Sequence, residues 1–107
     1  LYVASKHAVL GLTRAVALEY ARKNIRINAV CPAAVDTAMF RRFVDTNPDL
    51  EATVNEMHPM GRTGTPEEIA EAVYWLCTKG SWTTGQAITI DGGLLCETNL
   101  TGVPPLS

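Results

Sequence analysis

The chain has 107 residues, 47% apolar and 19% charged, so it can bury one modest core and form no more than one domain. Its formal net charge of -2 and its scattered basic residues give no electrostatic reason to expect nucleic acid or membrane as a partner. The densest basic spot, Arg41 and Arg42, predicts a solvated helix face. No apolar run approaches the roughly 20 residues that cross a bilayer and no signal-peptide pattern opens the chain, so we expect a cytoplasmic protein.

Cysteine and histidine spacing argues against a metal site. The three cysteines, Cys31, Cys77 and Cys96, are widely spaced and form no CxxC pair. We therefore expect free thiols, mostly buried, in a reducing compartment. His7 and His58 have no carboxylate or cysteine at ligand spacing, so no metal is expected.

The first predicted element is a helix from Val3 to about Arg22, a stretch without proline in which good helix formers dominate. Small residues recur along one side of it in steps of four, three and four, and we call these the small-residue stripe: Ala4, Ala8, Gly11 and Ala15. Such a stripe allows another helix to approach closely. Apolar residues on the remaining sides predict that this helix is covered on more than one face.

A short strand is predicted next, at residues 25–31, because apolar and polar residues alternate there until Pro32, which cannot continue a ladder. Two short amphipathic helices are predicted between Thr37 and about Met57, with a break at Asn47-Pro48. Residues 59–65 contain two glycines and predict a loop.

The last predicted helix begins after a Thr65 cap, runs to about Cys77 and ends at Lys79-Gly80. A second strand is predicted at residues 86–90, between two turns, and residues 94–107 form a tail. This order is α/β with parallel strands expected. Two strands alone do not make a stable doubly wound sheet, so further strands must come from elsewhere.

Tyr2 and Lys6 lie four positions apart at the start of the first helix, so their side chains project from one face and can share a site. By itself this spacing is weak, because such a pair is common in helices where the tyrosine is packed and the lysine solvated. The pair is followed, in order and without large gaps, by these segments: Ala8, Gly11-Leu12, Glu19, Ile25-Arg26-Ile27-Asn28, Pro32, Thr84-Gly85-Gln86 and Asp91-Gly92-Gly93.

From Leu1 to about Gly93 this series resembles the short-chain dehydrogenase/reductase family, whose YxxxK motif Tyr2 and Lys6 match. The resemblance implies an oxidoreductase that uses NAD or NADP and passes a hydride between the nicotinamide and a small alcohol or ketone. Tyr2 would be its general acid/base. A phenol with a pKa near ~10 is a poor base at neutral pH, and the Lys6 cation favours its anion. By resemblance Lys6 also holds the nicotinamide ribose hydroxyls.

The loop from Pro32 to Thr37 is similar to the family's PGxxxT segment, which meets the nicotinamide. Backbone groups around Val35 would pair with the carboxamide, and the Thr37 hydroxyl would reach the carboxamide or a phosphate. Ala33 replaces the family's glycine, so the loop must keep a negative φ there or distort. Without the resemblance the loop is an ordinary strand exit and Thr37 a helix N-cap, and both roles can hold together. The implied cofactor-binding residues are Tyr2, Lys6, Pro32, Ala33, Val35 and Thr37.

Met39, Phe40 and Phe43 fall, with Val44, where the family places a substrate-covering lid. Their apolar character suggests a substrate with hydrocarbon parts. A helix that simply caps the core is an equally good interpretation.

The resemblance implies that residues 1–107 are the C-terminal portion of one doubly wound, Rossmann-type domain, with the dinucleotide-binding half absent. The family's glycine-rich loop, catalytic serine and the residue that chooses NAD or NADP all precede the YxxxK tyrosine. The segment alone is therefore expected to be inactive, and the complete enzyme to be a homodimer or homotetramer. The alternative is a truncated, non-catalytic module that acts in assembly through the small-residue stripe.

Overall fold

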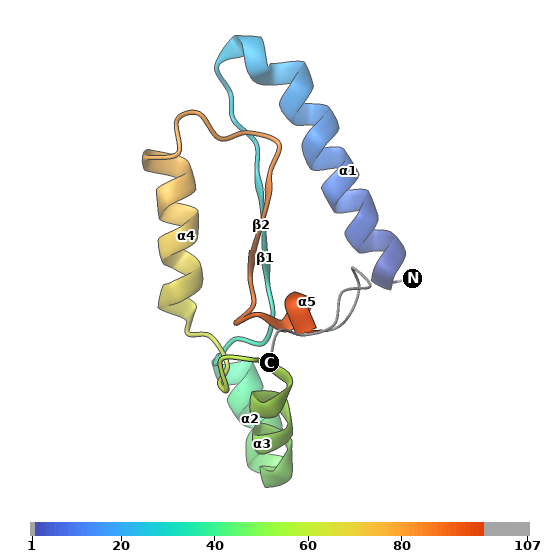
Figure 1. The fold of residues 1–107 in the computed structure, drawn as a ribbon, viewed down its shortest axis with the longest axis vertical. Coiled ribbons are helices and arrows are strands. Elements are labelled where there is room, and N and C mark those ends of the chain that lie inside the picture. Colours follow the sequence, from blue (N-terminus) through green and yellow to red (C-terminus); the bar gives the residue numbers. More distant parts are fainter. Residues whose placement is uncertain (1, 98–107) are drawn as a thin grey trace. The chain divides into compact units, whose positions relative to one another are not determined.

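The computed structural model describes the backbone of residues 2–97 and the side chains of residues 4–96 (Figure 1). The chain divides into two compact units, unit 1 with residues 2–31 and 70–89 and unit 2 with residues 32–69 and 90–97. The elements are α1 (Tyr2–Tyr20), the 3-10 turn η1 (Ala21–Lys23), β1 (Ala29–Pro32), α2 (Ala38–Thr46), α3 (Pro48–Met57), α4 (Pro66–Thr78), β2 (Ala87–Ile90) and α5 (Leu94–Glu97).

α1 confirms the long helix predicted at the start of the chain. It continues into η1 and stops at Asn24, which has a left-handed backbone with a φ of 61° and donates its N–H to the Ala21 carbonyl. Ala17 is the buried residue of the described part of α1. The small-residue stripe is exposed, and a Cβ added to Gly11 would meet nothing within 4 Å. The described residues therefore do not provide the cover predicted for this helix.

β1 and β2 form a two-stranded parallel sheet, as expected from the sequence (Figure 1). Ala29 donates its N–H to the Gln86 carbonyl at 2.8 Å, and Ala33 donates to the Ile90 carbonyl at 3.3 Å, so both strands advance together. The predicted end of the strand before Pro32 is wrong, because Pro32 is the last residue of β1. Neighbouring N–H groups point to alternate sides of a strand, so the N–H that proline lacks would have faced away from β2.

The predicted start of this strand at Ile25 is also wrong, since residues 25–28 are irregular. There the backbone is bound by groups of the turn that leads into β2. Ile27 donates its N–H to the Thr84 hydroxyl at 3.1 Å and accepts from the Gly85 N–H at 2.7 Å. One side-chain and one backbone hydrogen bond to this turn thus take the place of a regular ladder just before β1 begins.

Arg26 and Asn28 hold the connection between α4 and β2. The Arg26 guanidinium donates to the carbonyls of Gly80 at 2.6 Å, Thr83 at 3.1 Å and Cys77 at 3.4 Å. The Asn28 amide donates to the Thr83 carbonyl at 3.1 Å, and its oxygen accepts from the N–H of residue 86 at 3.0 Å. These bonds fix the end of α4 and the register of β2 against β1.

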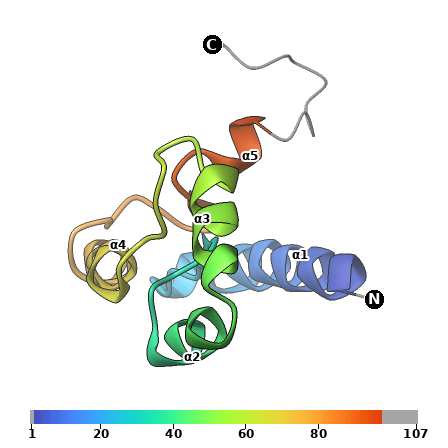
Figure 2. The ribbon, with the colours of Figure 1, turned by 90° about the horizontal axis from the view of Figure 1, so that it is seen from below.

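In unit 2, α2 and α3 lie side by side and confirm the predicted pair of helices broken at Asn47-Pro48 (Figure 2). Val44 of α2 is buried. His58, directly after α3, is only 4% exposed and its Nδ1 lies 2.7 Å from the Val54 carbonyl. Gly92, at a φ of 61°, brings the turn after β2 against His58, because a Cβ there would lie 3.7 Å from that of the histidine.

α4 begins at the predicted Thr65 cap, whose hydroxyl accepts the Glu68 N–H at 3.2 Å. The Glu68 carboxylate accepts the Thr65 N–H at 2.9 Å in return, which completes a capping box. The tail predicted at residues 94–107 starts with the short helix α5, and residues 98–107 lie outside the described part. None of the helices in the described part is long and apolar enough to cross a membrane.

The expectation of mostly buried thiols is wrong. Cys31 is half-buried, whereas Cys77 and Cys96 are exposed. Cys77 follows the buried Leu76 on α4, and successive residues of a helix point about 100° apart, so the thiol leaves the core side.

Candidate functional site

The predicted catalytic pair lies on the first two turns of α1, in unit 1. Positions 2 and 6 are one helical turn apart, so the helix that the YxxxK interpretation requires is present and places Tyr2 and Lys6 on one face. The Lys6 side chain is exposed, and the Tyr2 side chain lies outside the described residues.

The predicted nicotinamide loop, residues 32–37, lies in unit 2 and is held by a parallel bridge between Val35 and Gly64. Gly64 donates its N–H to the Ala34 carbonyl at 3.0 Å, and Asp36 donates to the Gly64 carbonyl at 2.8 Å. Both bonds use backbone groups that flank Val35. The N–H and C=O of Val35 itself therefore point away from Gly64.

Ala33 has the negative φ that its side chain requires at this position of the loop. Its φ is not in the left-handed region, where Asn24 is the sole non-glycine residue of the described part. Its N–H donates to the Ile90 carbonyl, so the hydrogen bonding to β2 continues one residue past the end of β1. A methyl group is thus accommodated at a negative φ without strain.

Thr37 is the N-cap of α2, as the sequence predicts. Its hydroxyl oxygen accepts the Phe40 N–H at 3.2 Å, and its carbonyl accepts the Arg41 N–H at 2.9 Å. Its own N–H donates to the Val35 carbonyl at 2.8 Å. A hydroxyl that accepts one bond keeps its proton to donate, so a second role toward a ligand oxygen is open to Thr37.

These groups fit the carboxamide of a nicotinamide cofactor. A carboxamide needs an N–H donor for its oxygen and a carbonyl acceptor for its amide. Val35 offers an outward N–H, and its carbonyl keeps a second lone pair beside the bond from Thr37. The nearby N-terminus of the nine-residue helix α2 also favours negative charge.

α2 divides the predicted lid residues between two faces. Phe40 is half-buried and Val44 buried, which matches a helix that caps the core. Met39 and Phe43, also four positions apart, are 62% and 61% exposed. They form an apolar face that the described residues do not cover, and their role as a substrate lid stays a prediction.

Arg41 and Arg42 are both exposed on α2, as the sequence predicts. Arg41 also forms ion pairs. It donates from Nε and Nη2 to the two Asp36 carboxylate oxygens at 2.6 and 3.1 Å, and from Nη1 to Glu51 at 3.0 Å. These bonds raise the pKa of Arg41, with the bond to Asp36 the larger cause, and lower that of Asp36. A bidentate pair has a more defined geometry than an ordinary surface contact.

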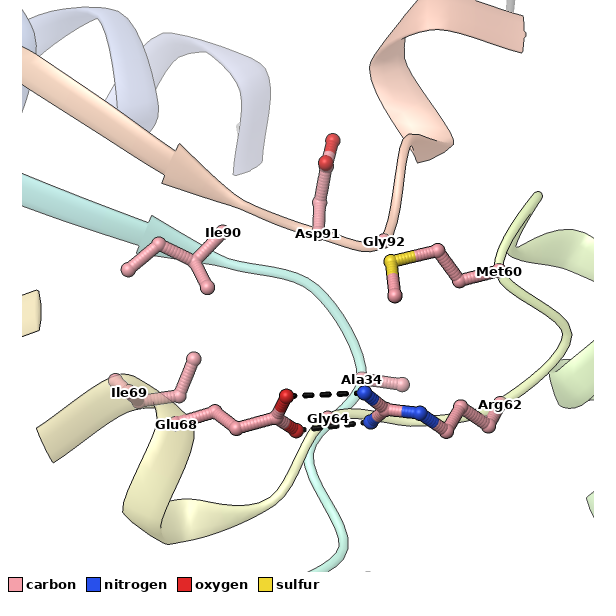
Figure 3. A pocket seen from close by; sticks show the side chains of 9 residues that line it. All are labelled: Ala34, Met60, Arg62, Gly64, Glu68, Ile69, Ile90, Asp91 and Gly92. Carbon is pink, nitrogen blue, oxygen red and sulfur yellow. Dashed lines mark hydrogen bonds and ion pairs between the residues drawn. The ribbon is translucent and has the colours of Figure 1, made fainter. Parts of the chain in front are cut away.

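A second ion pair lines a small pocket of about 90 Å³ in unit 2 (Figure 3). Arg62 binds both Glu68 oxygens at 2.8 and 3.0 Å, and this bond, helped by the Thr65 N–H, lowers the pKa of Glu68 to about 2. Asp91 points away from the pair and accepts the N–H groups of Gly93 and Leu95. The pocket is far smaller than the roughly 300–1,000 Å³ of typical small-molecule sites.

Asp36 and Arg41 are the residues near the loop that sequence reasoning missed. The only signal was an acid and a base five positions apart across a helix start, which no helical spacing rule pairs. Within the described residues, no three His, Cys, Asp or Glu side chains gather at metal-binding distance.

The chain is similar to known proteins over most of its length. The family model described as enoyl-(acyl carrier protein) reductase matches residues 1–95. Short-chain dehydrogenase RED2 of Pyricularia oryzae is 48% identical over 100 residues, which are 92% of this chain and 36% of that protein. The 2,5-dichloro-2,5-cyclohexadiene-1,4-diol dehydrogenase of Sphingobium indicum is 45% identical over 93 residues, 86% of this chain and 37% of that protein.

Among solved structures, ElxO with NADP bound matches with a TM-score of 0.83 and 37% identity, over 90% of this chain and 39% of that one. The chain thus spans less than two fifths of the length of these relatives. The alternative of a non-catalytic assembly module gains no support from these comparisons.

Proposed function

Because this chain belongs to the short-chain dehydrogenase/reductase family, we propose that the complete protein is an NAD(P)-dependent oxidoreductase acting on a small alcohol or carbonyl compound. The observation that carries the proposal is the loop at residues 32–37. Its bridge to Gly64 turns the Val35 N–H and C=O outward, as a carboxamide requires. The NADP bound to ElxO and the diol dehydrogenase of Sphingobium indicum support the same class of chemistry.

In this proposal the loop holds and orients the nicotinamide. Val35 binds the carboxamide through its backbone, and Thr37 donates its hydroxyl to the carboxamide or to a phosphate oxygen while it caps α2. When bound, the cofactor supplies or accepts the hydride. Pro32 ends β1, and the bond from the Ala33 N–H to the Ile90 carbonyl holds the start of the loop against β2.

Tyr2 exchanges a proton with the substrate oxygen, and Lys6 supports it from the next turn of α1. In the reduction direction the phenol donates its proton to the oxygen that gains charge, and in oxidation the phenolate removes it. The Lys6 ammonium favours the phenolate and donates to the ribose hydroxyls. A methionine at position 6 could do neither, because it has no charge and no hydrogen-bond donor.

The apolar face of Met39 and Phe43 covers the hydrocarbon part of the substrate. Burying such side chains against an apolar ligand is favourable, and it excludes water from the reacting carbon. Phe40 and Val44 hold the opposite side of α2 in the core of unit 2.

We also propose that the complete protein is a homodimer or homotetramer that packs the small-residue stripe of α1 against another helix. The stripe is exposed, and Gly11 has open space around it. Backbones can approach closely over such residues, which suits a symmetric helix pair.

The test uses Tyr2→Phe and Lys6→Met in the complete protein, with turnover of NADH and NADPH followed on a panel of ketones and aldehydes. Tyr2→Phe keeps the ring and removes the transferable proton, so kcat should fall about 100-fold or more with little change in cofactor Kd. Lys6→Met should lower kcat and also raise the cofactor Kd. If Tyr2→Phe keeps more than about a tenth of wild-type kcat, Tyr2 is not the acid/base.

A further inference from the structure

The Arg41 side chain joins three segments of unit 2, one of which is the proposed nicotinamide loop. It projects from α2, binds Asp36 in the loop through two nitrogens, and binds Glu51 of α3 through the third. A guanidinium presents its donors in a fixed plane, so it can hold two carboxylates in a defined geometry.

Asp36 stands between the two residues that contact the cofactor in the proposed function. Val35 precedes it and Thr37 follows it, and the Val35 carbonyl accepts the Thr37 N–H at 2.8 Å. The Asp36 backbone is anchored to Gly64, while its carboxylate is anchored to Arg41. The loop is therefore fixed from two sides at its central residue.

The ion pairs of Arg41 also reduce the repulsion between the Asp36 carboxylate and a negatively charged cofactor. A cofactor with phosphates brings negative charge near Thr37, and an unpaired carboxylate one residue away would repel it. Arg41 neutralises the carboxylate of Asp36, whose side chain is 34% exposed. The link to Glu51, 38% exposed, ties the same cation to α3.

From this arrangement we infer that Arg41 is a positioning residue: its bidentate bond to Asp36 holds the nicotinamide loop to α2, so that cofactor affinity depends on it, and its bond to Glu51 ties α3 to the same cation. The inference rests on the proposed function. Arg41 is 46% exposed and an isolated exposed ion pair stabilises little, but a bidentate network is the exception to that rule. Its effect should therefore appear in loop order and cofactor binding more than in overall stability.

The experiment compares Arg41→Met with Arg42→Met in the complete protein. Arg42 is the matched control, since it is the next residue of α2, is exposed, and has no side-chain ion pair within the described residues. NADH and NADPH binding is measured by fluorescence titration, and amide hydrogen exchange of residues 33–37 and 48–57 is measured without cofactor. Arg41→Met should raise the cofactor Kd about three- to tenfold and speed exchange in both segments, while Arg42→Met changes the Kd less than about twofold.

Two further variants test the coupling itself. Glu51→Met removes only the link to α3, since methionine offers no oxygen acceptor, so it should speed exchange there and leave the Kd within about twofold. The effects of Arg41→Met and Asp36→Asn on Kd should not add, because each breaks the same pair. If Arg41→Met does not fold, Arg41→Lys provides the comparison with Asp36→Asn. Lysine keeps the positive charge but lacks the planar pair of donors that binds both Asp36 oxygens.

Failure of the proposed function and failure of the inference about Arg41 give different results. A wild-type protein that binds neither NADH nor NADPH overturns the proposed function, and this inference with it. A wild-type protein that binds cofactor, with Arg41→Met equal to Arg42→Met in Kd and in loop exchange, overturns the inference alone. Additive effects of Arg41→Met and Asp36→Asn also overturn it.

Discussion

Replacing Arg26 by methionine should destabilise the protein more than any other single loss of surface charge in unit 1. Arg26 donates to the carbonyls of Gly80, Thr83 and Cys77, which belong to the end of α4 and the turn after it. Methionine keeps the aliphatic length of the side chain and removes all three donors. The carbonyl at the end of α4 also loses a cation that complements the helix dipole.

The magnitude follows from the number of bonds and their access to water. A hydrogen bond to a charged donor contributes about 1.5–3 kcal/mol. The bond to Gly80 at 2.6 Å and that to Thr83 at 3.1 Å are part-buried, whereas the one to Cys77 is long and exposed. Since water can replace part of what is lost, we expect a total loss of roughly 1.5–3 kcal/mol in the free energy of unfolding, not the full sum.

The assay is urea denaturation of the complete protein at one fixed protein concentration, with Arg22→Met as the control. Arg22 lies in η1 and is exposed, so its variant should stay within about 0.5 kcal/mol of wild type. The Arg26→Met midpoint should fall with an unchanged slope. A loss below about 0.5 kcal/mol would show that water fully replaces the guanidinium and would refute the reasoning.

Three further predictions concern other parts of the chain. Val35→Pro removes the Val35 N–H, which points away from Gly64, and leaves both bonds to Gly64 in place. The NADH Kd should therefore rise about tenfold in Val35→Pro, while Val35→Ala should bind NADH like wild type. Equal Kd values for both variants would contradict the assignment of residues 32–37 as the nicotinamide loop. The pKa of Glu68 is lowered from 4.5 to about 2, so its stabilising effect is complete above the unfolded value and lost as pH falls. The difference in unfolding free energy between wild type and Glu68→Gln should therefore be constant above about pH 5 and shrink between pH 4.5 and about 2, and a difference independent of pH would contradict this. Gly11→Leu should lower the molecular mass in solution by forcing helices apart, and an unchanged mass and Tm would show that the stripe is not a packing surface.

Much of the secondary structure could be predicted because local signals agree. The helix break at Asn47-Pro48, the Thr65 cap and the alternation before Asp91 each depend on residues within one or two turns. The late start of β1 could not be predicted, because Ile27 is bound by the Thr84 hydroxyl, 57 positions away. A periodic pattern describes neighbouring residues only, so it cannot reveal a hydrogen-bond partner that lies so far away in the sequence.

In the candidate site, too, features set by neighbouring residues could be predicted, whereas contacts between distant segments could not. Thr37 as a helix cap follows from its place before α2, and the negative φ of Ala33 follows from its Cβ. The bridge between Val35 and Gly64, which decides where the Val35 N–H points, is a contact between two loops and leaves no pattern in either. The pairing of Arg41 with Asp36 depends on that same loop geometry.

The central claim, that this protein passes a hydride between a nicotinamide and a carbon atom with Tyr2 as acid/base, is tested most directly by isotope transfer. NADH or NADPH carrying deuterium at the transferable position of the nicotinamide is incubated with the complete protein and a panel of ketones and aldehydes, and the products are analysed by mass spectrometry. We expect deuterium on the carbinol carbon of a product alcohol, formed at least about 100-fold more slowly by Tyr2→Phe. Equal rates of label transfer by wild type and Tyr2→Phe, or alcohol formed without the label, would contradict it.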